Sequence, residues 1–147
     1  MTSVLVHVGL TTRDMDRSRR FYTEALGFTF DRELRMTGDQ IDGLLRLQPK
    51  SDLHAVYLRL GAFTLELMQF DPAADAGAGV RRFNQTGLAH LSIAVADMPA
   101  TLERVVAAGG VVASHAGRAC IVRDPDGQLI ELLEIAVHDE IEARRRG

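Results

Sequence analysis

The chain has 147 residues, 46% of them hydrophobic and 25% charged, as in one ordinary globular domain. Its net charge of −3, the absence of any apolar stretch near the roughly 20 residues of a membrane span and the absence of an apolar leader argue against nucleic acid, membranes and secretion. A single cysteine, Cys120 in an apolar run, excludes an internal disulfide and fits a buried core residue in a reducing cytoplasm.

The first predicted elements are a strand and a helix. Residues 4–10 alternate between Val or Leu and a second set that includes His7, which predicts a strand with two different faces. Residues 15–26 carry an apolar stripe at helical spacing, with Asp14 placed to cap the helix and Gly27 to end it.

After this helix the pattern predicts strands near residues 28–34, 44–48, 54–60 and 63–70. Gly61-Ala62 supplies the turn of the last hairpin. The stretch 31–52 is rich in Gly, Asp, Gln and Lys, and we expect an extended loop or lid there.

Residues 71–86, "DPAADAGAGVRRFNQT", are rich in Ala, Gly and Asp and are typical of a linker. A second strand with His90 follows, and then a helix that begins after Asp97 and stops at Gly109-Gly110. The remaining strands are predicted near 111–114, 118–124 and 128–136, with a tight turn at "DPDG". Residues 137–147 are a charged, solvated C-terminal tail in this interpretation.

The two halves repeat one pattern. One offset of 83 positions separates His7 from His90, Met15 from Met98 and Gly27 from Gly110. The sequence therefore predicts an α+β fold made of two βαβββ modules, at about 3–70 and 87–136, within a single domain that spans 1–136.

Each module also places a glutamate inside its last apolar strand. Glu66 lies in "TLELMQF" and Glu131 in "QLIELLEI", flanked on both sides by Leu or Ile. A carboxylate on the buried face of a sheet is costly unless it is paired or binds a metal. Two imidazoles and two carboxylates suit Zn, Ni, Co, Mn or Fe better than Ca or Mg, so His7, Glu66, His90 and Glu131 are the candidate ligands of one divalent ion.

Other polar side chains have no repeat partner. His54, His115 and His138 are expected at the surface or at a sheet edge. Tyr57, Met68 and Gln69 are the candidates for substrate contact, with core packing as the alternative for Tyr57 and Met68.

The sequence resembles the vicinal oxygen chelate superfamily, which includes glyoxalase I, methylmalonyl-CoA epimerase, fosfomycin-resistance transferases, extradiol dioxygenases and bleomycin-binding proteins. The motifs that carry the resemblance are "HVGLTTRDMDRSRRFYTEALGF", "TLELMQF", "LAHLSIAVADM" and "DPDGQLIELLE". It implies a cup-shaped mixed sheet around a metal, with ligands at His7, Glu66, His90 and Glu131. It also implies a homodimer, whose sites form within one chain or across two.

The ligand set resembles the glyoxalase I type, but two positions depart from it. Where bacterial glyoxalase I usually has Arg and Asn for glutathione, this chain has Thr11 and Phe70. The resemblance therefore implies proton transfer next to a carbonyl by an isomerase, epimerase or lyase on a small molecule or acyl thioester, with Glu131 or Glu66 as base. The alternatives are an extradiol-type dioxygenase and a small-molecule-binding or resistance protein without catalysis.

Overall fold

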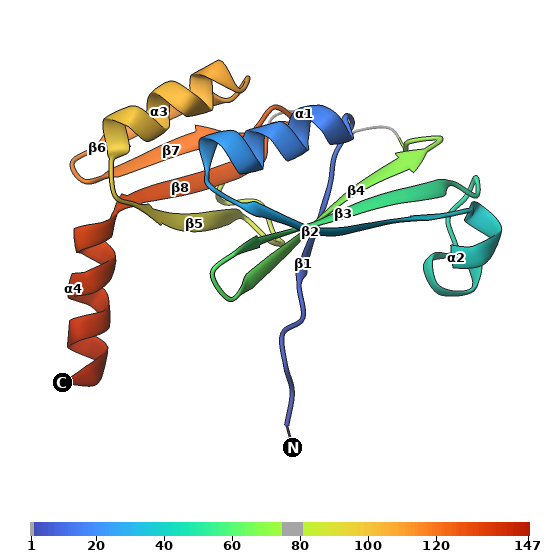
Figure 1. The fold of residues 1–147 in the computed structure, drawn as a ribbon, viewed down its shortest axis with the longest axis horizontal. Coiled ribbons are helices and arrows are strands. Elements are labelled where there is room, and N and C mark those ends of the chain that lie inside the picture. The colour runs from blue at the N-terminus through green and yellow to red at the C-terminus, as the bar shows by residue number, and fades with distance from the viewer. Residues whose placement is uncertain (1, 75–80) are drawn as a thin grey trace. The chain divides into compact units, whose positions relative to one another are not determined.

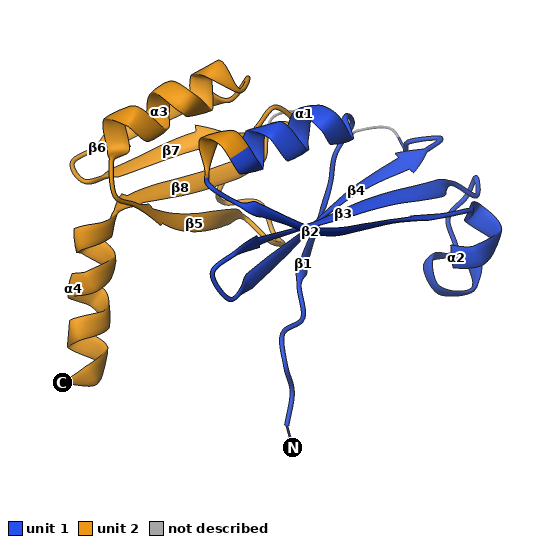
Figure 2. Ribbon diagram, viewed as in Figure 1, with its two compact units in different colours: residues 1–23, 27–77 blue, residues 24–26, 78–147 orange. Residues whose placement is uncertain are grey.

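The computed structural model describes residues 2–74 and 81–147. They form two compact units, which Figure 2 colours separately: Met1–Thr23 with Gly27–Gly77, and Glu24–Leu26 with Ala78–Gly147. Residues 24–26, which fall within the predicted first module at about 3–70, are grouped with the second unit. The predicted linker 71–86 lies partly outside the described residues, and β4, defined below, continues to Asp71.

The first unit is a four-stranded sheet in the order β1-β4-β3-β2. β1 is parallel to β4, and the other neighbours are antiparallel. The four strands are β1 (Val8–Thr11), β2 (Thr29–Met36), β3 (Asp52–Leu60) and β4 (Phe63–Asp71). β1 begins later than the predicted residue 4, and the side chains of Val4, Leu5 and Val6 are exposed.

Helix α1 (Met15–Arg20) lies over one face of this sheet (Figure 1). It continues as a π-helical turn, η1 (Phe21–Ala25), close to the predicted range. As predicted, Asp14 caps it, with its Oδ1 accepting from the Arg17 N–H at 2.9 Å. On this face of the sheet, side chains at alternate positions are fully buried: Val56, Leu58, Leu65 and Leu67.

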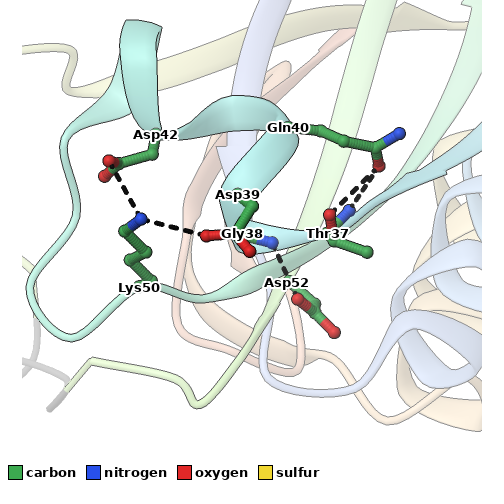
Figure 3. Close-up of polar contacts among 7 residues, drawn as sticks. All are labelled: Thr37, Gly38, Asp39, Gln40, Asp42, Lys50 and Asp52. Carbon is green, nitrogen blue, oxygen red and sulfur yellow. Dashed lines mark hydrogen bonds and ion pairs between the residues drawn. The ribbon is translucent and has the colours of Figure 1, made fainter.

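The strand predicted at 44–48 and the extended loop predicted at 31–52 are wrong. Residues 31–36 belong to β2, and the chain then forms helix α2 (Gly38–Leu45). The helix starts with a capping arrangement in which Gln40 Oε1 accepts from the Thr37 N–H at 2.8 Å (Figure 3). The helix ends at Leu45. The next residue, Arg46, has a left-handed backbone with φ of 49°, which continues neither a helix nor a strand.

Polar contacts also hold α2 to its flanking chain (Figure 3). The Gly38 N–H donates to Asp52 Oδ1 at 2.8 Å. Lys50 Nζ lies 3.0 Å from Asp39 Oδ1 and 3.3 Å from Asp42 Oδ2. Underneath, Ile41 packs against Leu53, Ala55 and Tyr57, which are buried on β3.

The second unit repeats the sheet order, as β5-β8-β7-β6. Its elements are β5 (His90–Val95), α3 (Met98–Ala107), β6 (Val111–Ala116), β7 (Ala119–Arg123) and β8 (Leu129–Glu134). Asp97 caps α3, and Asp124 Oδ1 accepts two backbone N–H groups in the predicted turn. Cys120 is buried on β7, as predicted, and burial raises the pKa of its thiol. The predicted fold class, α+β with two βαβββ modules, is therefore confirmed.

The C-terminal residues differ from the prediction in form. The last strand stops at Glu134, and helix α4 (Ile135–Arg146) replaces the expected tail. No residue of α4 is buried, and Arg118 pairs with both Glu134 and Glu140 at 3.0 Å. No helix in the described ranges has the length and apolar character that a bilayer crossing requires.

Candidate metal site

The first unit places His7 beside Glu66. Strand pairing aligns Glu66 of β4 with Gly9 of β1, and His7 lies two residues before Gly9, on the same side of the chain. His7 Nε2 is 3.0 Å from Glu66 Oε2. Glu66 is 9% exposed, so its carboxylate lies in a largely dry position although β4 is otherwise apolar at its centre.

Tyr57 on β3 is the register partner of Glu66 and completes this arrangement. Its hydroxyl donates to Glu66 Oε1 at 2.6 Å, and its ring stands edge-on to the imidazole of His7. The guanidinium of Arg32 lies 3.9 Å from the ring centre. Burial, followed by the hydrogen bond to Glu66, raises the pKa of Tyr57, so the phenol is protonated and able to donate at neutral pH.

The second unit places His90 beside Glu131. His90 Nε2 is 3.7 Å from Glu131 Oε2, and the same oxygen accepts from Ser92 Oγ at 2.7 Å. The register partners of Glu131 are Ser92 on β5 and Ile121 on β7. The Glu131 side chain is 31% exposed, against 11% for Glu66, so the two carboxylates occupy different environments.

Within each pair, the distance between the His nitrogen and the Glu oxygen suits two donor atoms bound to one metal ion. Donor atoms that each lie about 2.1 Å from one ion are about 3.0 Å apart at right angles and about 3.4 Å apart in a tetrahedron. The observed separations of 3.0 Å and 3.7 Å are close to these values. Within the described part of each unit no third His, Cys, Asp or Glu joins the pair, so each unit by itself offers two ligands. The residues present in each unit therefore fit half of a four-ligand metal site.

His7 Nδ1 takes no part in the contact with Glu66. It is buried and has no hydrogen-bond partner, although buried polar atoms are normally satisfied. The imidazole is therefore held by its Nε2 side, toward Glu66, and by its edge contact with Tyr57.

The three predicted substrate contacts lie in different surroundings. Tyr57 hydrogen-bonds Glu66, as described. Met68 is on the same face as Glu66 by strand alternation and packs, half-buried, against the cluster around Ile41. Gln69 is on the opposite face, where its Oε1 accepts from the Met15 N–H at 2.8 Å and holds the start of α1.

Two cavities of the first unit lie away from the His7–Glu66 pair. Their volumes are about 360 Å³ and 400 Å³, and they share Arg35, His54 and Gln69 in their walls. The side chain of His54 is 16% exposed, so it is less accessible than predicted, whereas His115 and His138 are exposed as expected.

Sequence reasoning missed two residues of the site. Ser92 could have been found, because it lies 83 positions after Gly9 and thus occupies the equivalent strand position. Arg32 carried no such signal. It reaches Tyr57 because β2 pairs with β3 across an irregular register between Phe30 and Arg32.

Several proteins are similar to this chain over 71–88% of its length. A probable chloroplastic lactoylglutathione lyase from Arabidopsis thaliana is 30% identical over 138 residues, which are 88% of this chain and 35% of that protein. This chain thus spans about a third of that relative. A lactoylglutathione lyase from Haemophilus influenzae is 28% identical over 145 residues and matches 88% of this chain and 91% of its own. A 2-epi-5-epi-valiolone epimerase from Actinomyces sp is 33% identical over 108 residues, 71% of this chain and 58% of that protein.

Solved structures agree on the fold. A glyoxalase family protein from Bacillus cereus superposes with a TM-score of 0.72 at 18% identity, covering 88% of this chain and 92% of its own. The model of the glyoxalase/bleomycin resistance protein/dioxygenase superfamily matches residues 4–132. Because this match includes both modules and all four candidate ligands, the chain belongs to the glyoxalase/bleomycin resistance protein/dioxygenase superfamily.

Proposed function

We propose that this protein is a divalent-metal-dependent enzyme that transfers a proton at a carbon next to a carbonyl group. The observation that carries the proposal is that each unit presents a His–Glu pair at equivalent strand positions, His7 with Glu66 and His90 with Glu131. The names of the relatives, lyase and epimerase, support the same class of reaction.

The two pairs together would hold one divalent ion, one of Zn, Ni, Co, Mn or Fe. Such an ion polarises the carbonyl and stabilises the negative charge that develops on its oxygen when the neighbouring carbon loses a proton. The four side chains supply two neutral imidazoles and two carboxylates, which balance the charge of the ion.

Glu131 is the proposed proton carrier. Its side chain is the more exposed of the two carboxylates, so it can reach a bound substrate, and it is held by a single Ser92 hydroxyl. A carboxylate placed at the reacting carbon takes the proton and returns it to the same or the adjacent carbon. Glu66 is the second candidate for this role.

The proposed substrate is an acyl thioester or a metabolite that carries a ketone, rather than a glutathione adduct. Thr11 and Phe70 stand where glutathione contacts are expected from the family resemblance, and Phe70 packs against the apolar cluster around Ile41. Since several relatives are named lactoylglutathione lyases, the glutathione hemithioacetal of methylglyoxal is the necessary comparison substrate.

Deuterium exchange tests this function. The protein loaded with each candidate metal is incubated in D2O with 2-substituted 3-oxo compounds, acyl-CoA compounds or the hemithioacetal, and label is measured at the carbon beside the carbonyl. We expect metal-dependent incorporation. Oxygen consumption with a catechol, and no exchange with any carbonyl compound, would establish the dioxygenase alternative instead. Ligand binding with neither reaction would establish the binding-protein alternative.

We also propose a homodimer, in keeping with the family resemblance. Light scattering at micromolar concentration checks this, and a mass equal to one chain would contradict it.

A further inference from the structure

Tyr57 is held from several sides, and only its hydroxyl reaches Glu66. The side chain is 7% exposed and packs in the cluster with Ile41, Leu53 and Ala55. Its ring also contacts the His7 imidazole edge-on at 5.6 Å between centroids and carries the Arg32 guanidinium on its face. A ring packed in this way presents its hydroxyl in one fixed direction.

This hydroxyl donates a hydrogen bond to one of the two carboxylate oxygens of Glu66. The O–H donates to Oε1 at 2.6 Å, while Oε2 is the oxygen 3.0 Å from His7 Nε2. Charge-assisted hydrogen bonds of this length are among the stronger ones in proteins. Glu66 therefore turns one defined oxygen toward the imidazole and cannot rotate without losing the phenol.

Gly9 leaves room for this arrangement on the other neighbouring strand. A methyl group placed on Gly9 would lie 2.8 Å from Met68 Cε and 3.5 Å from Glu66 Oε2. The lack of a side chain on Gly9 thus leaves space beside the oxygen that faces His7.

Among the described residues of the second unit, the strand neighbours of Glu131 include no residue equivalent to Tyr57. Ile121 takes the register position of Tyr57 and has no hydroxyl, while Ser92 takes that of Gly9. Ser92 donates to Glu131 Oε2, the same oxygen that faces His90. The chain therefore anchors Glu66 from an inner strand, through the oxygen turned away from its histidine, and supports Glu131 only from an edge strand.

We propose that Tyr57 is a positioning residue that locks one oxygen of Glu66 and so makes Glu66 the stationary ligand of the metal site. This inference rests on the proposed function. It also replaces the predicted substrate contact of Tyr57 with a role that acts through Glu66. Arg32, stacked on the Tyr57 ring, supports the same position.

The test measures metal binding directly. Tyr57→Phe removes only the hydroxyl, and Co²⁺ is the probe, followed by its visible absorption spectrum and by its dissociation constant in competition with a chelator. We expect Tyr57→Phe to weaken Co²⁺ binding about tenfold or more and to change the spectrum, as loss of a residue that orients a ligand does. Thr29→Val, which removes an exposed hydroxyl elsewhere in the same sheet, is the matched control and should bind as the wild type does.

A second variant guards against a folding defect. Arg32→Met keeps bulk over the ring but removes its charge, and the Arg32 side chain is 55% exposed, so the fold should tolerate it. We expect a weakening of about two- to fivefold. If the wild type binds Co²⁺ and both variants bind it with unchanged affinity and spectrum, the positioning role is wrong while the proposed function stands. If the wild type itself binds no divalent ion, the proposed function fails, and this inference with it.

Discussion

The two units carry the same pair of candidate ligands, His and Glu, and surround them with different side chains. In the first, Glu66 is nearly dry and bound by the buried phenol of Tyr57. In the second, Glu131 is about a third exposed and bound by Ser92 at the sheet edge. Both units thus bring one histidine and one glutamate together, while the residues around the two pairs differ. Such a difference allows one carboxylate to hold a metal and the other to move a proton.

Removing either histidine should have the largest effect, because the proposed ion takes ligands from both His–Glu pairs. His90→Ala and His7→Ala should each abolish stoichiometric metal binding and activity, measured by metal analysis of protein purified without chelator and by the exchange assay. His115→Ala, an exposed histidine of the same type, is the control and should change neither. Metal content that persists in His90→Ala would contradict the assignment of the ligands.

Substitution of the two glutamates should affect different properties, proton exchange for Glu131 and metal binding for Glu66. Glu131→Gln should slow deuterium exchange by about 10²-fold or more if it carries the proton. Glu66→Gln should mainly weaken metal binding, because an amide is a poorer ligand than a carboxylate. Single-turnover exchange at saturating metal separates these effects. The reverse pattern, with exchange lost in Glu66→Gln and preserved in Glu131→Gln, would reverse the two roles.

Ile121→Tyr sharpens the comparison by giving the second unit the residue of the first. Ile121 is the register partner of Glu131 and is only half-buried, so a phenol has space there. If mobility of Glu131 matters, the new hydroxyl should hold it and lower the rate of exchange by about tenfold, with metal affinity unchanged or higher. Ile121→Phe, which adds the ring without the hydroxyl, is the matched control, and an equal loss in both variants would indicate a steric effect only.

Helix α2 lies between β2 and β3, and the residues described in the second unit form no helix between the corresponding strands β6 and β7. We expect the stability of α2 to depend more on its packing than on its ion pairs. Ile41→Ala should lower the free energy of unfolding by about 2–4 kcal/mol, since Ile41 is 6% exposed beneath the helix. Lys50→Ala should cost much less than Ile41→Ala, because Lys50 and its partner Asp39 are exposed and water weakens their ion pair. Urea unfolding measures both, and a larger loss in Lys50→Ala would show that the ion pairs dominate.

Much of the fold could be predicted because the repeat is direct. The offset between His7 and His90 marked equivalent strands, and the apolar alternation of β4 and β8 marked their buried faces. Helix α2 could not be read from propensity, because Gly38 and Gly43 lie within it, and the contacts that hold it involve Asp52 and β3, outside the helix. Helix α4 lacks an apolar stripe and buries no residue, so periodicity gave it no signal.

The repeat in the sequence singled out the four candidate ligands, but it gave no sign of the side chains that contact them. The contact of Tyr57 with Glu66 depends on the pairing of β3 with β4, which no local pattern specifies. The direction of the Gln69 side chain could have been read from strand alternation. Gln69 lies three residues after Glu66 on a strand and therefore points to the opposite side, toward the start of α1.

The central claim is that the two His–Glu pairs together bind one divalent ion. Native mass spectrometry of protein purified without chelator tests it most directly, because it counts ions and chains in the same particle. We expect one ion for every chain in the wild type and none in either His7→Ala or His90→Ala. Two ions per chain, none in the wild type, or an unchanged count in the single-histidine variants would contradict it.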